Sequence, residues 1–419
     1  MSFGAAAFAA YRGAGWIAAP LARPHLASRA ARGKEDPTRT EEKRGVASAS
    51  LSERPVWLHA VSVGESVAAL ALATRLEAAG FTVLFTTGTP TAAARIAAEA
   101  PHLTHQYAPL DAPPFVERFL AHWRPRAALF TEAEIWPTTL HMLARQGVPR
   151  AHINARLSRR SFRSWHRTGP LGRYLFGLIP LALAQSPADA QRFFTLGVSS
   201  AQSTGNLKFD APPPAAPHQA TQALRHAIGD RPVWLAASIH PGEEDAIVLA
   251  HKTLTASHPG LVTILAPRHL STADLVESSA RAHGVSTTRR SAGDDPAGLY
   301  IADTLGELGV FMAIAPVTFL GGSLVPLSGH NPAEPAAHAS ALLTGPSYGS
   351  MFDPFLNGGA AREVADGTAL TATVARLLNA ADERAAMVEG AAAVLAAERG
   401  ATDRTMAALA PLLAAAKAL

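Results

Sequence analysis

The chain has no cysteine, and this absence removes several classes of chemistry at once. Without thiols there can be no disulfide bond, no thiolate nucleophile and no cysteine-ligated zinc or iron–sulfur site. Aromatic residues (6%) and charged residues (17%) are also few, whereas hydrophobic residues make up 48% of the 419 residues. This balance excludes disorder across the chain and predicts a globular protein of about two domains.

An excess of positive charge is missing from most of the chain. The net charge is +4, from 37 basic and 33 acidic side chains. Residues 1–50 carry eight of the basic and four of the acidic side chains, so residues 51–419 are neutral, with 29 of each. A nucleic-acid-binding protein carries its basic excess on the folded body. We therefore exclude nucleic acid as a partner and predict a basic leader.

A long hydrophobic run is also missing. Residues 1–22 are apolar, but Arg12 interrupts them, and a membrane-spanning helix needs about 20 predominantly apolar residues. A secretory signal has its charge before the apolar run, whereas here the charge follows it. Two interpretations remain for residues 1–50. They form a membrane-associating leader, with Tyr11 and Trp16 at the headgroup level, or a solvated leader without a membrane role.

The rest of the chain predicts an α/β fold. Short apolar runs alternate with helical patterns from residue 55, and the alternation restarts after a proline cluster at residues 211–219. The expected strands are residues 56–61, 81–85, 127–131, 150–153, 181–184, 233–237, 262–266, 299–302, 317–320 and 341–344. Two such series indicate two doubly wound parallel sheets, Rossmann-like domains that face a cleft.

These patterns divide the chain into five parts. We expect the leader at 1–50, an N-terminal domain at 51–210, a linker at 211–219, a C-terminal domain at 220–400 and a last helix at 401–419. Ligands of doubly wound sheets bind beyond the carboxyl ends of the strands, so the functional residues are expected in the turns that follow strands.

The turns of the first domain contain carboxylates and a lysine. Glu65 begins a helix after the first strand, where it can act as a general base or complement the helix dipole, and local sequence alone favours the dipole. Glu132 and Glu134 follow another strand, and a spacing of two suggests that at most one faces the site. Lys208 lies before the linker, where it can hold an anion or be an ordinary surface lysine.

The turns of the second domain resemble anion sites. Arg268 follows a strand and offers a guanidinium to phosphate. Thr304 and Glu307 have capping-box spacing, with Gly306 giving access to a helix N-terminus. A plain capping box is the alternative.

Two further turns complete this pattern. Gly322 and Ser323 offer backbone amides to a phosphate. Asn331 caps a helix that starts at Pro332, and Glu334 can bind ribose hydroxyls. Together, these turns predict a nucleotide-sugar site.

Ordered motifs along residues 55–400 resemble the 3-deoxy-D-manno-octulosonic acid (Kdo) transferases of lipid A biosynthesis, glycosyltransferase family 30. The matching segments are residues 59–65, 86–90, 131–137, 154–158, 184–186, 205–210, 240–244, 267–269, 303–308, 321–324 and 330–334. So many motifs in one order make coincidence implausible.

The resemblance implies a GT-B fold and inverting transfer of Kdo from CMP-Kdo to a lipid A precursor (lipid IVA), without a metal or other cofactor. It implies that Glu65 is the general base and that Glu132 and Lys208 stabilise the transition state. The implied CMP-binding residues are Pro267, Arg268, Leu305, Gly306, Glu307, Gly322, Ser323, Asn331, Pro332, Ala333 and Glu334. The family's N-terminal helix rests on the cytoplasmic face of the inner membrane, which implies an anionic membrane surface as a further partner.

Two other functions fit the same pattern less well. One is another GT-B nucleotide-sugar transferase or a sugar-nucleotide epimerase. The other is a two-domain protein that binds an anionic solute without reacting with it. Such binding proteins are usually exported, and the absence of a convincing signal peptide counts against this alternative.

Overall fold

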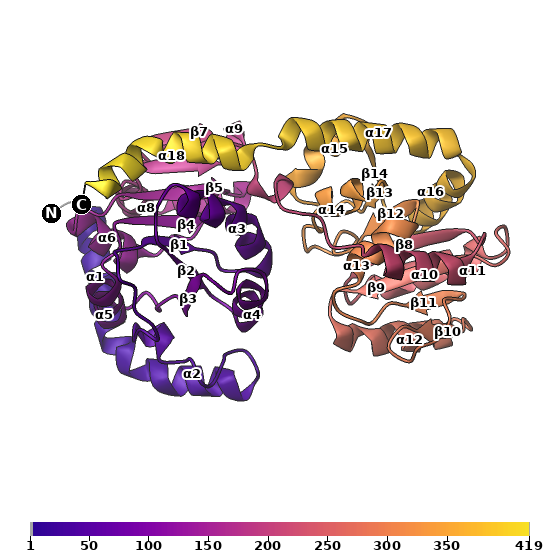
Figure 1. Cartoon of the computed structure of the whole chain (residues 1–419), viewed down its shortest axis with the longest axis horizontal. Coiled ribbons are helices and arrows are strands. Elements are labelled where there is room, and N and C mark those ends of the chain that lie inside the picture. The colour runs from indigo at the N-terminus through magenta and orange to yellow at the C-terminus, as the bar shows by residue number, and fades with distance from the viewer. Residues whose placement is uncertain (1–2, 419) are drawn as a thin grey trace. The chain divides into compact units, whose positions relative to one another are not determined.

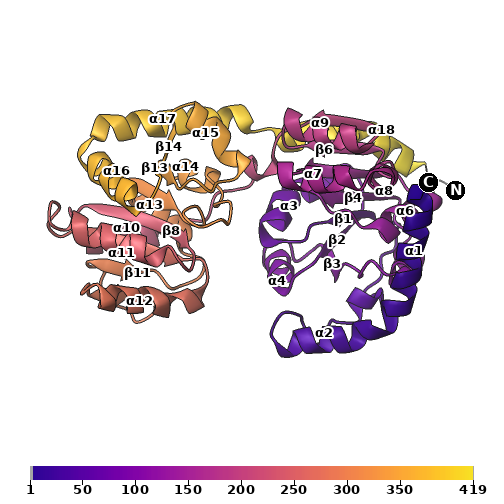
Figure 2. The same cartoon turned by 180° about the vertical axis from the view of Figure 1, so that it is seen from behind.

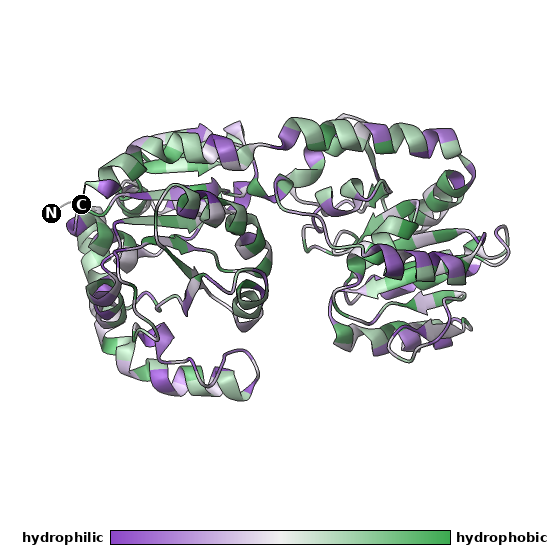
Figure 3. Cartoon of the chain, viewed as in Figure 1, coloured by the Kyte–Doolittle hydropathy of each residue, from purple (hydrophilic) through white to green (hydrophobic). Residues whose placement is uncertain are grey.

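The computed structural model describes residues 3–418. Contacts within the chain divide it into two compact units, one of residues 1–211 with 399–419 and one of residues 212–398 (Figure 1). Each unit is built around its own parallel sheet, and the strands of both sheets are mainly hydrophobic (Figure 3).

The first unit contains a seven-stranded parallel sheet in the order β3-β2-β1-β4-β5-β6-β7. The strands are β1 (Val56–His59), β2 (Val83–Thr87), β3 (Thr104–Tyr107), β4 (Ala127–Thr131), β5 (Arg150–Ala155), β6 (Leu181–Ala184) and β7 (Ser200–Ser203). The edge strands β3 and β7 were not predicted. Both are short and partly polar, and β7 is mostly exposed, so neither has the apolar run that marks a buried strand.

Helices cover both faces of this sheet, because neighbouring residues of a strand point to opposite sides. Leu58 of β1 packs with α3 and α4, whereas Trp57 packs with α5, α6, α8 and α9. The helices are α3 (Val63–Ala78), α4 (Pro90–Glu99), α5 (Pro113–Trp123), α6 (Pro137–Arg145), α7 (Arg159–Arg167), α8 (Pro170–Phe176), α9 (Pro187–Leu196) and α18 (Ala401–Lys417). The last helix, α18, returns to this unit, where Leu409 and Leu413 join the cluster around Leu58 (Figure 2).

The N-terminal segment is folded onto the first unit. It forms α1 (Phe3–Ala18), a short 3-10 turn (Ala19–Leu21) and α2 (Ala22–Ala31). Phe8 of α1 is buried, with its ring 4.7 Å from that of His141. The Tyr11 hydroxyl donates to Asp111 at 3.1 Å. Among residues 3–418, no helix is both long and apolar enough to cross a membrane.

Ion pairs neutralise much of the leader's charge. Lys43 and Glu35 are both buried and form an ion pair at 2.5 Å, and Arg39 pairs with the buried Glu42 at 2.7 Å. Glu42 also accepts the backbone N–H of Tyr107 at 2.7 Å, which ties the segment to β3. The leader is therefore folded onto the first unit, and the basic stretch is less open to lipid than its composition predicts.

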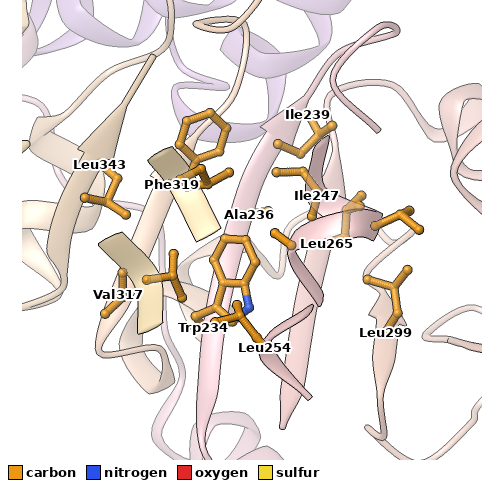
Figure 4. Close-up of a cluster of buried hydrophobic side chains, with 14 of the residues drawn as sticks. Trp234, Ala236, Ile239, Ile247, Leu254, Leu265, Leu299, Val317, Phe319 and Leu343 are labelled. Carbon is orange, nitrogen blue, oxygen red and sulfur yellow. The ribbon is translucent and has the colours of Figure 1, made fainter. Parts of the chain in front are cut away.

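The second unit contains another seven-stranded parallel sheet, in the order β10-β11-β9-β8-β12-β13-β14. The strands are β8 (Val233–Ile239), β9 (Val262–Pro267), β10 (Thr287–Arg289), β11 (Leu299–Ile301), β12 (Val317–Leu320), β13 (Ala341–Thr344) and β14 (Ala361–Glu363). Trp234 of β8 lies at the centre of the buried cluster, beside Val317 and Leu254 (Figure 4). Again the unpredicted strands, β10 and β14, are three-residue edge strands.

The helices of the second unit surround this core. They are α10 (His218–Ile228), α11 (Glu244–Leu254), α12 (Ala273–Ala282), α13 (Leu308–Ile314), α14 (Ala333–Ala337), α15 (Asp353–Asn357), α16 (Gly367–Asn379) and α17 (Ala381–Glu398). Helix α10 begins at His218, inside the predicted linker. The carbonyl of Pro214 accepts a hydrogen bond from His338 Nε2 at 2.9 Å, so part of that proline cluster is anchored to the second unit.

Candidate functional site

Glu65 lies in the first turn of α3, directly beyond the carboxyl end of β1. Its Oε1 accepts the Ser62 hydroxyl at 2.7 Å, and its Oε2 accepts the Thr131 hydroxyl at 2.8 Å and the Val61 N–H at 3.1 Å. A carboxylate has about four acceptor positions. Glu65 is thus bonded to the N-cap residue of its own helix, and one acceptor position remains on Oε1 for a further donor.

Glu132 and Lys208 form an ion pair at 2.8 Å. Glu132 directly follows β4 and has a φ of +52°, a left-handed conformation that is strained for a residue with a side chain. The alternation of an extended strand therefore stops at Thr131. Lys208 lies in the 3-10 turn after β7 (Leu207–Phe209), so the pair joins residues that are far apart in sequence.

A layer of amide side chains holds the turn that carries Lys208. Asn206 Oδ1 accepts the Lys208 N–H, and Asn154 Oδ1 accepts the Leu207 N–H, both at 3.0 Å. Gln185 Oε1 accepts from Asn206 Nδ2 at 3.2 Å. Sequence reasoning assigned no role to these amides. Positive φ at Asn154 (+47°) is a signal that only the structure reveals.

Glu134 is a third carboxyl group at this site. Burial raises its pKa, and the charges of Glu65 and Glu132 raise it further, although a hydrogen bond from Trp136 Nε1 at 2.8 Å acts the other way. Both acids of this turn thus influence one region, contrary to the expectation that at most one would face the site. The physical reason is that residues two apart in an extended strand point to the same side, so this spacing does not separate the two carboxylates. The backbone also leaves the extended conformation at Glu132.

The predicted residues of the second unit lie beyond its own strands. Arg268 follows β9 with an exposed side chain, and its N–H donates to the Ile239 carbonyl at 2.9 Å. Pro267 is the last residue of β9 and is partly buried. A guanidinium held on a fixed backbone and open to solvent can bind phosphate.

Glu307 forms an ion pair in place of the hydrogen bonds of the predicted capping box. Arg290 donates to both of its carboxylate oxygens, at 2.7 and 3.1 Å, and this hydrogen bonding lowers the pKa of Glu307. The Thr304 hydroxyl also donates to this carboxylate. Helix α13 begins at Leu308, so Thr304 is not its N-cap and the predicted capping box is wrong. Leu305 and Gly306 remain exposed in the preceding turn.

The backbone amides that follow β12 already donate to a carboxylate of the protein, that of Glu243. Glu243 is fully buried, and each of its carboxylate oxygens accepts two backbone N–H groups. The donors are the N–H groups of Gly322 (2.6 Å), Leu324 (2.9 Å), His240 (3.0 Å) and Ser323 (3.1 Å). The expectation that Gly322 and Ser323 offer amides to phosphate is therefore corrected, because Glu243 occupies that position.

Ser323 is buried and has no hydrogen-bonding group to spare. Its hydroxyl donates to the Leu320 carbonyl and accepts the Gly345 N–H at 2.8 Å, and its carbonyl accepts the Ser347 N–H. We assign Ser323 to the framework of the site rather than to ligand contact.

The Asn331 turn is close to the prediction. Asn331 Oδ1 accepts the Ala333 N–H at 3.1 Å, and its Nδ2 donates to Glu334 at 3.3 Å. Helix α14 begins at Ala333, one residue later than expected, with Pro332 before it. Among the described residues no group of histidines and carboxylates is arranged to hold a metal ion.

The sequence of this chain is similar to those of known proteins. A family model described as 3-deoxy-D-manno-octulosonic-acid transferase (Kdo transferase) matches residues 38–211. The 3-deoxy-D-manno-octulosonic acid transferase of Haemophilus influenzae is 33% identical over 374 residues, which cover 85% of this chain and 87% of that protein. The enzyme of the same name from Bordetella pertussis is 36% identical over 377 residues, which cover 85% and 86%.

The fold of this chain is similar to those of several proteins of known structure. A glycosyltransferase from Rickettsia africae has a TM-score of 0.59 at 11% identity, covering 87% of this chain and 99% of that one. UDP-GlcNAc 2-epimerase from Neisseria meningitidis has a TM-score of 0.56 at 13% identity, covering 80% and 94%. The C-terminal CMP-Kdo binding domain of WaaA from Acinetobacter baumannii is 30% identical, with a TM-score of 0.41, and covers 42% and 96%.

Proposed function

The chain belongs to the family of 3-deoxy-D-manno-octulosonic acid (Kdo) transferases, and from this premise we propose that it moves Kdo from CMP-Kdo to a hydroxyl of a lipid A precursor. The enzyme is a glycosyltransferase with a GT-B fold, whose two parallel sheets are shared with glycosyltransferases and epimerases of known structure. The donor, the acceptor and inversion at the anomeric carbon belong to the proposal.

The observation that carries the proposal is the remaining acceptor position on Glu65 Oε1. In the reaction, the acceptor oxygen bonds to C2 of Kdo while the bond from C2 to the phosphate oxygen breaks. CMP leaves with that electron pair, and Glu65 takes the hydroxyl proton. Attack on the side opposite to the leaving phosphate inverts the configuration at C2. Glu65 is suited to this role because three protein donors already fix its orientation.

Glu132 and Lys208 supply a fixed charge pair beside this base. Loss of CMP leaves positive charge on the sugar ring, which the Glu132 carboxylate can stabilise. The Lys208 ammonium pairs with Glu132 and can also hold an acidic group of the sugar or of the acceptor. The strained backbone at Glu132 is consistent with a position kept for its side chain.

For the donor, we propose contacts from three turns of the second unit. The exposed Arg268 guanidinium binds phosphate, with Pro267 beside it. The turn of Leu305, Gly306 and Glu307 and the turn of residues 331–334 bind the nucleoside, while Gly322 and Ser323 shape the floor. Because all these turns follow strands of one parallel sheet, they lie at the same edge.

Product mass spectrometry tests the proposal. Purified protein incubated with CMP-Kdo and a tetraacylated lipid A precursor should give a precursor heavier by one or more Kdo units. The lipid must be essential for consumption of CMP-Kdo. Conversion of a nucleotide sugar without lipid would favour an epimerase, and tight CMP binding without any product would favour a binding protein.

We propose that the N-terminal segment places the enzyme on the cytoplasmic face of the inner membrane, where the acceptor lies. While Phe8 faces the protein, Trp16, Ile17 and Leu21 are 49%, 82% and 65% exposed. An apolar surface of this kind, on a segment that also carries the exposed Lys34, suits an anionic lipid surface.

Ile17→Asp and Leu21→Asp should each lower binding to vesicles containing anionic phospholipid by about tenfold or more, because each removes apolar area and adds a charge. Activity on detergent-dispersed acceptor should stay near the wild-type value. Leu275→Asp, at a leucine of the second unit that is 48% exposed, is the control. Single substitutions are preferable to a deletion of residues 1–48, because the deletion would also remove Glu42, which binds β3. Wild-type vesicle binding by both variants would contradict the proposal.

A further inference from the structure

Three histidines and an arginine gather at neighbouring strand ends of the second unit, and the mechanism above gives the histidines no role. His240 follows β8, Arg268 and His269 follow β9, and His330 lies in the loop between β12 and α14. Strands β9, β8 and β12 are adjacent in the sheet. The centre of the His240 ring lies 6.0 Å from that of His269.

His240 and His330 are joined by their ring nitrogens. Their Nε2 atoms are 3.0 Å apart, their ring planes differ by 9°, and their ring centres are 5.2 Å apart. The distance between the two ring centres is roughly the distance between the two Nε2 atoms plus the radii of both rings. The two rings therefore meet at their edges and do not lie face to face. This is the geometry of an N–H···N hydrogen bond. Gly322 lies against the pair, because a Cβ there would come 3.2 Å from His240 and 3.4 Å from His330.

The shared hydrogen bond restricts the protonation of the pair. When both rings are neutral, the donor ring has a bare Nδ1 and the acceptor ring has an Nδ1–H. When the pair takes up one proton, both Nδ1 atoms become donors and the Nε2–H···Nε2 bond persists. Neither Nδ1 has a hydrogen-bond partner among residues 3–418. In the neutral pair, one free Nδ1 is an acceptor and the other is a donor. After the pair takes up one proton, it is a cation and both Nδ1 atoms are donors, which suits the binding of an oxyanion.

The surroundings keep this pair neutral when no anion is bound. Burial, followed by the positive charges of Arg268, His240 and His269, lowers the pKa of His330 to about 4. Burial also lowers the pKa of His240, although the Glu243 carboxylate opposes this. A bound oxyanion would reverse the balance, because nearby negative charge favours an imidazolium.

We infer that the His240–His330 pair binds an oxyanion of the nucleotide-sugar donor and takes up one proton as it does so. The inference rests on the proposed donor, which carries a phosphate and a sugar carboxylate. The phosphate gains negative charge when CMP leaves. A pair that becomes cationic beside Arg268 would stabilise this charge as it develops.

Calorimetry of the full chain with CMP at pH 7.5, in buffers of different ionisation enthalpy, tests the inference. CMP has already lost its second phosphate proton at this pH, because that pKa is about 6, so any proton taken up enters the protein. We expect uptake of about one proton per CMP, and an affinity that falls by up to about tenfold per pH unit above pH 7. Cytidine, which lacks the phosphate, should bind without uptake.

The ligands distinguish the possible outcomes. Uptake with free Kdo but not with CMP would assign the pair to the carboxylate. Binding of CMP with no uptake by either ligand would overturn the inference and leave the proposed function intact. No binding of CMP at all would contradict the proposed donor, and the inference with it.

Variants and spectroscopy locate the proton. His240→Gln and His330→Gln should each abolish the uptake, whereas His218→Gln, at an exposed histidine of the same unit, should keep it. Imidazole nitrogen NMR of the wild-type protein does not depend on the folding of any variant. We expect the signals of two histidines to change toward the charged form when CMP binds. Histidine signals that stay at their neutral positions in CMP-saturated protein would overturn the inference.

Discussion

Glu65→Gln should lower the rate of Kdo transfer by about 10² to 10⁴-fold, the range expected when a general base is lost. The amide has the size of the carboxylate and can still accept from the Val61 N–H and the Thr131 hydroxyl. It cannot take a proton from the acceptor hydroxyl. The measurement is kcat for CMP release in the presence of acceptor, with CMP affinity measured separately and expected to stay within about twofold.

Ser62→Ala is the control that separates catalysis from capping. Ser62 accepts the Glu65 N–H as N-cap and donates to Glu65 Oε1, so its loss weakens the helix start by about 1 kcal/mol but leaves the carboxylate. If Glu65 served only the helix cap, the two variants would lose similar activity. Wild-type turnover by Glu65→Gln would remove Glu65 as the base.

Glu243→Ala should destabilise the second unit by more than about 3 kcal/mol. The buried carboxylate accepts four backbone N–H groups, and each buried donor left without a partner costs about 1–3 kcal/mol. Glu243→Gln should be nearly as damaging, because its amide NH₂ would face two N–H donors. The free energy of unfolding from urea denaturation gives the first readout. CMP affinity gives the second, because the loop from Gly322 to Leu324 would lose its shape.

Glu244→Gln is the matched control for this prediction. The neighbouring Glu244 carboxylate accepts a single backbone N–H, that of Gly242, at an exposed position. Its loss should change the stability by less than about 1 kcal/mol. Equal unfolding energies for the Glu243 and Glu244 variants would show that the four amides do not depend on Glu243.

Most of the fold could be predicted from the sequence, because central strands of parallel sheets are buried on both faces. That burial produces continuous apolar runs, such as Val56–His59 and Val317–Leu320, which local composition reveals. Edge strands such as Ser200–Ser203 lack this signal, since water covers part of them. Helix boundaries near Glu307 were also missed, because Arg290 and Thr304 bind the carboxylate that the capping rules assigned to the helix.

The candidate site could be predicted only in part. The sequence patterns place Glu65 and Glu132 after strands of one sheet, which is where α/β proteins bind ligands, and Lys208 before the linker. They do not predict that Glu132 adopts a left-handed backbone or that it pairs with Lys208. They also lead to a phosphate site at Gly322, where the structure has the Glu243 carboxylate.

The sequence by itself determined the absence of thiol chemistry, the α/β architecture, the family and the neutral body with a basic leader. These properties depend on composition and on local periodicity, which follow directly from residue types. Only the tertiary structure decided that the leader's charges pair at Lys43 and Glu35, and that His240 meets His330. Such contacts join residues distant in the chain, and their geometry depends on loop conformations that local propensities do not specify.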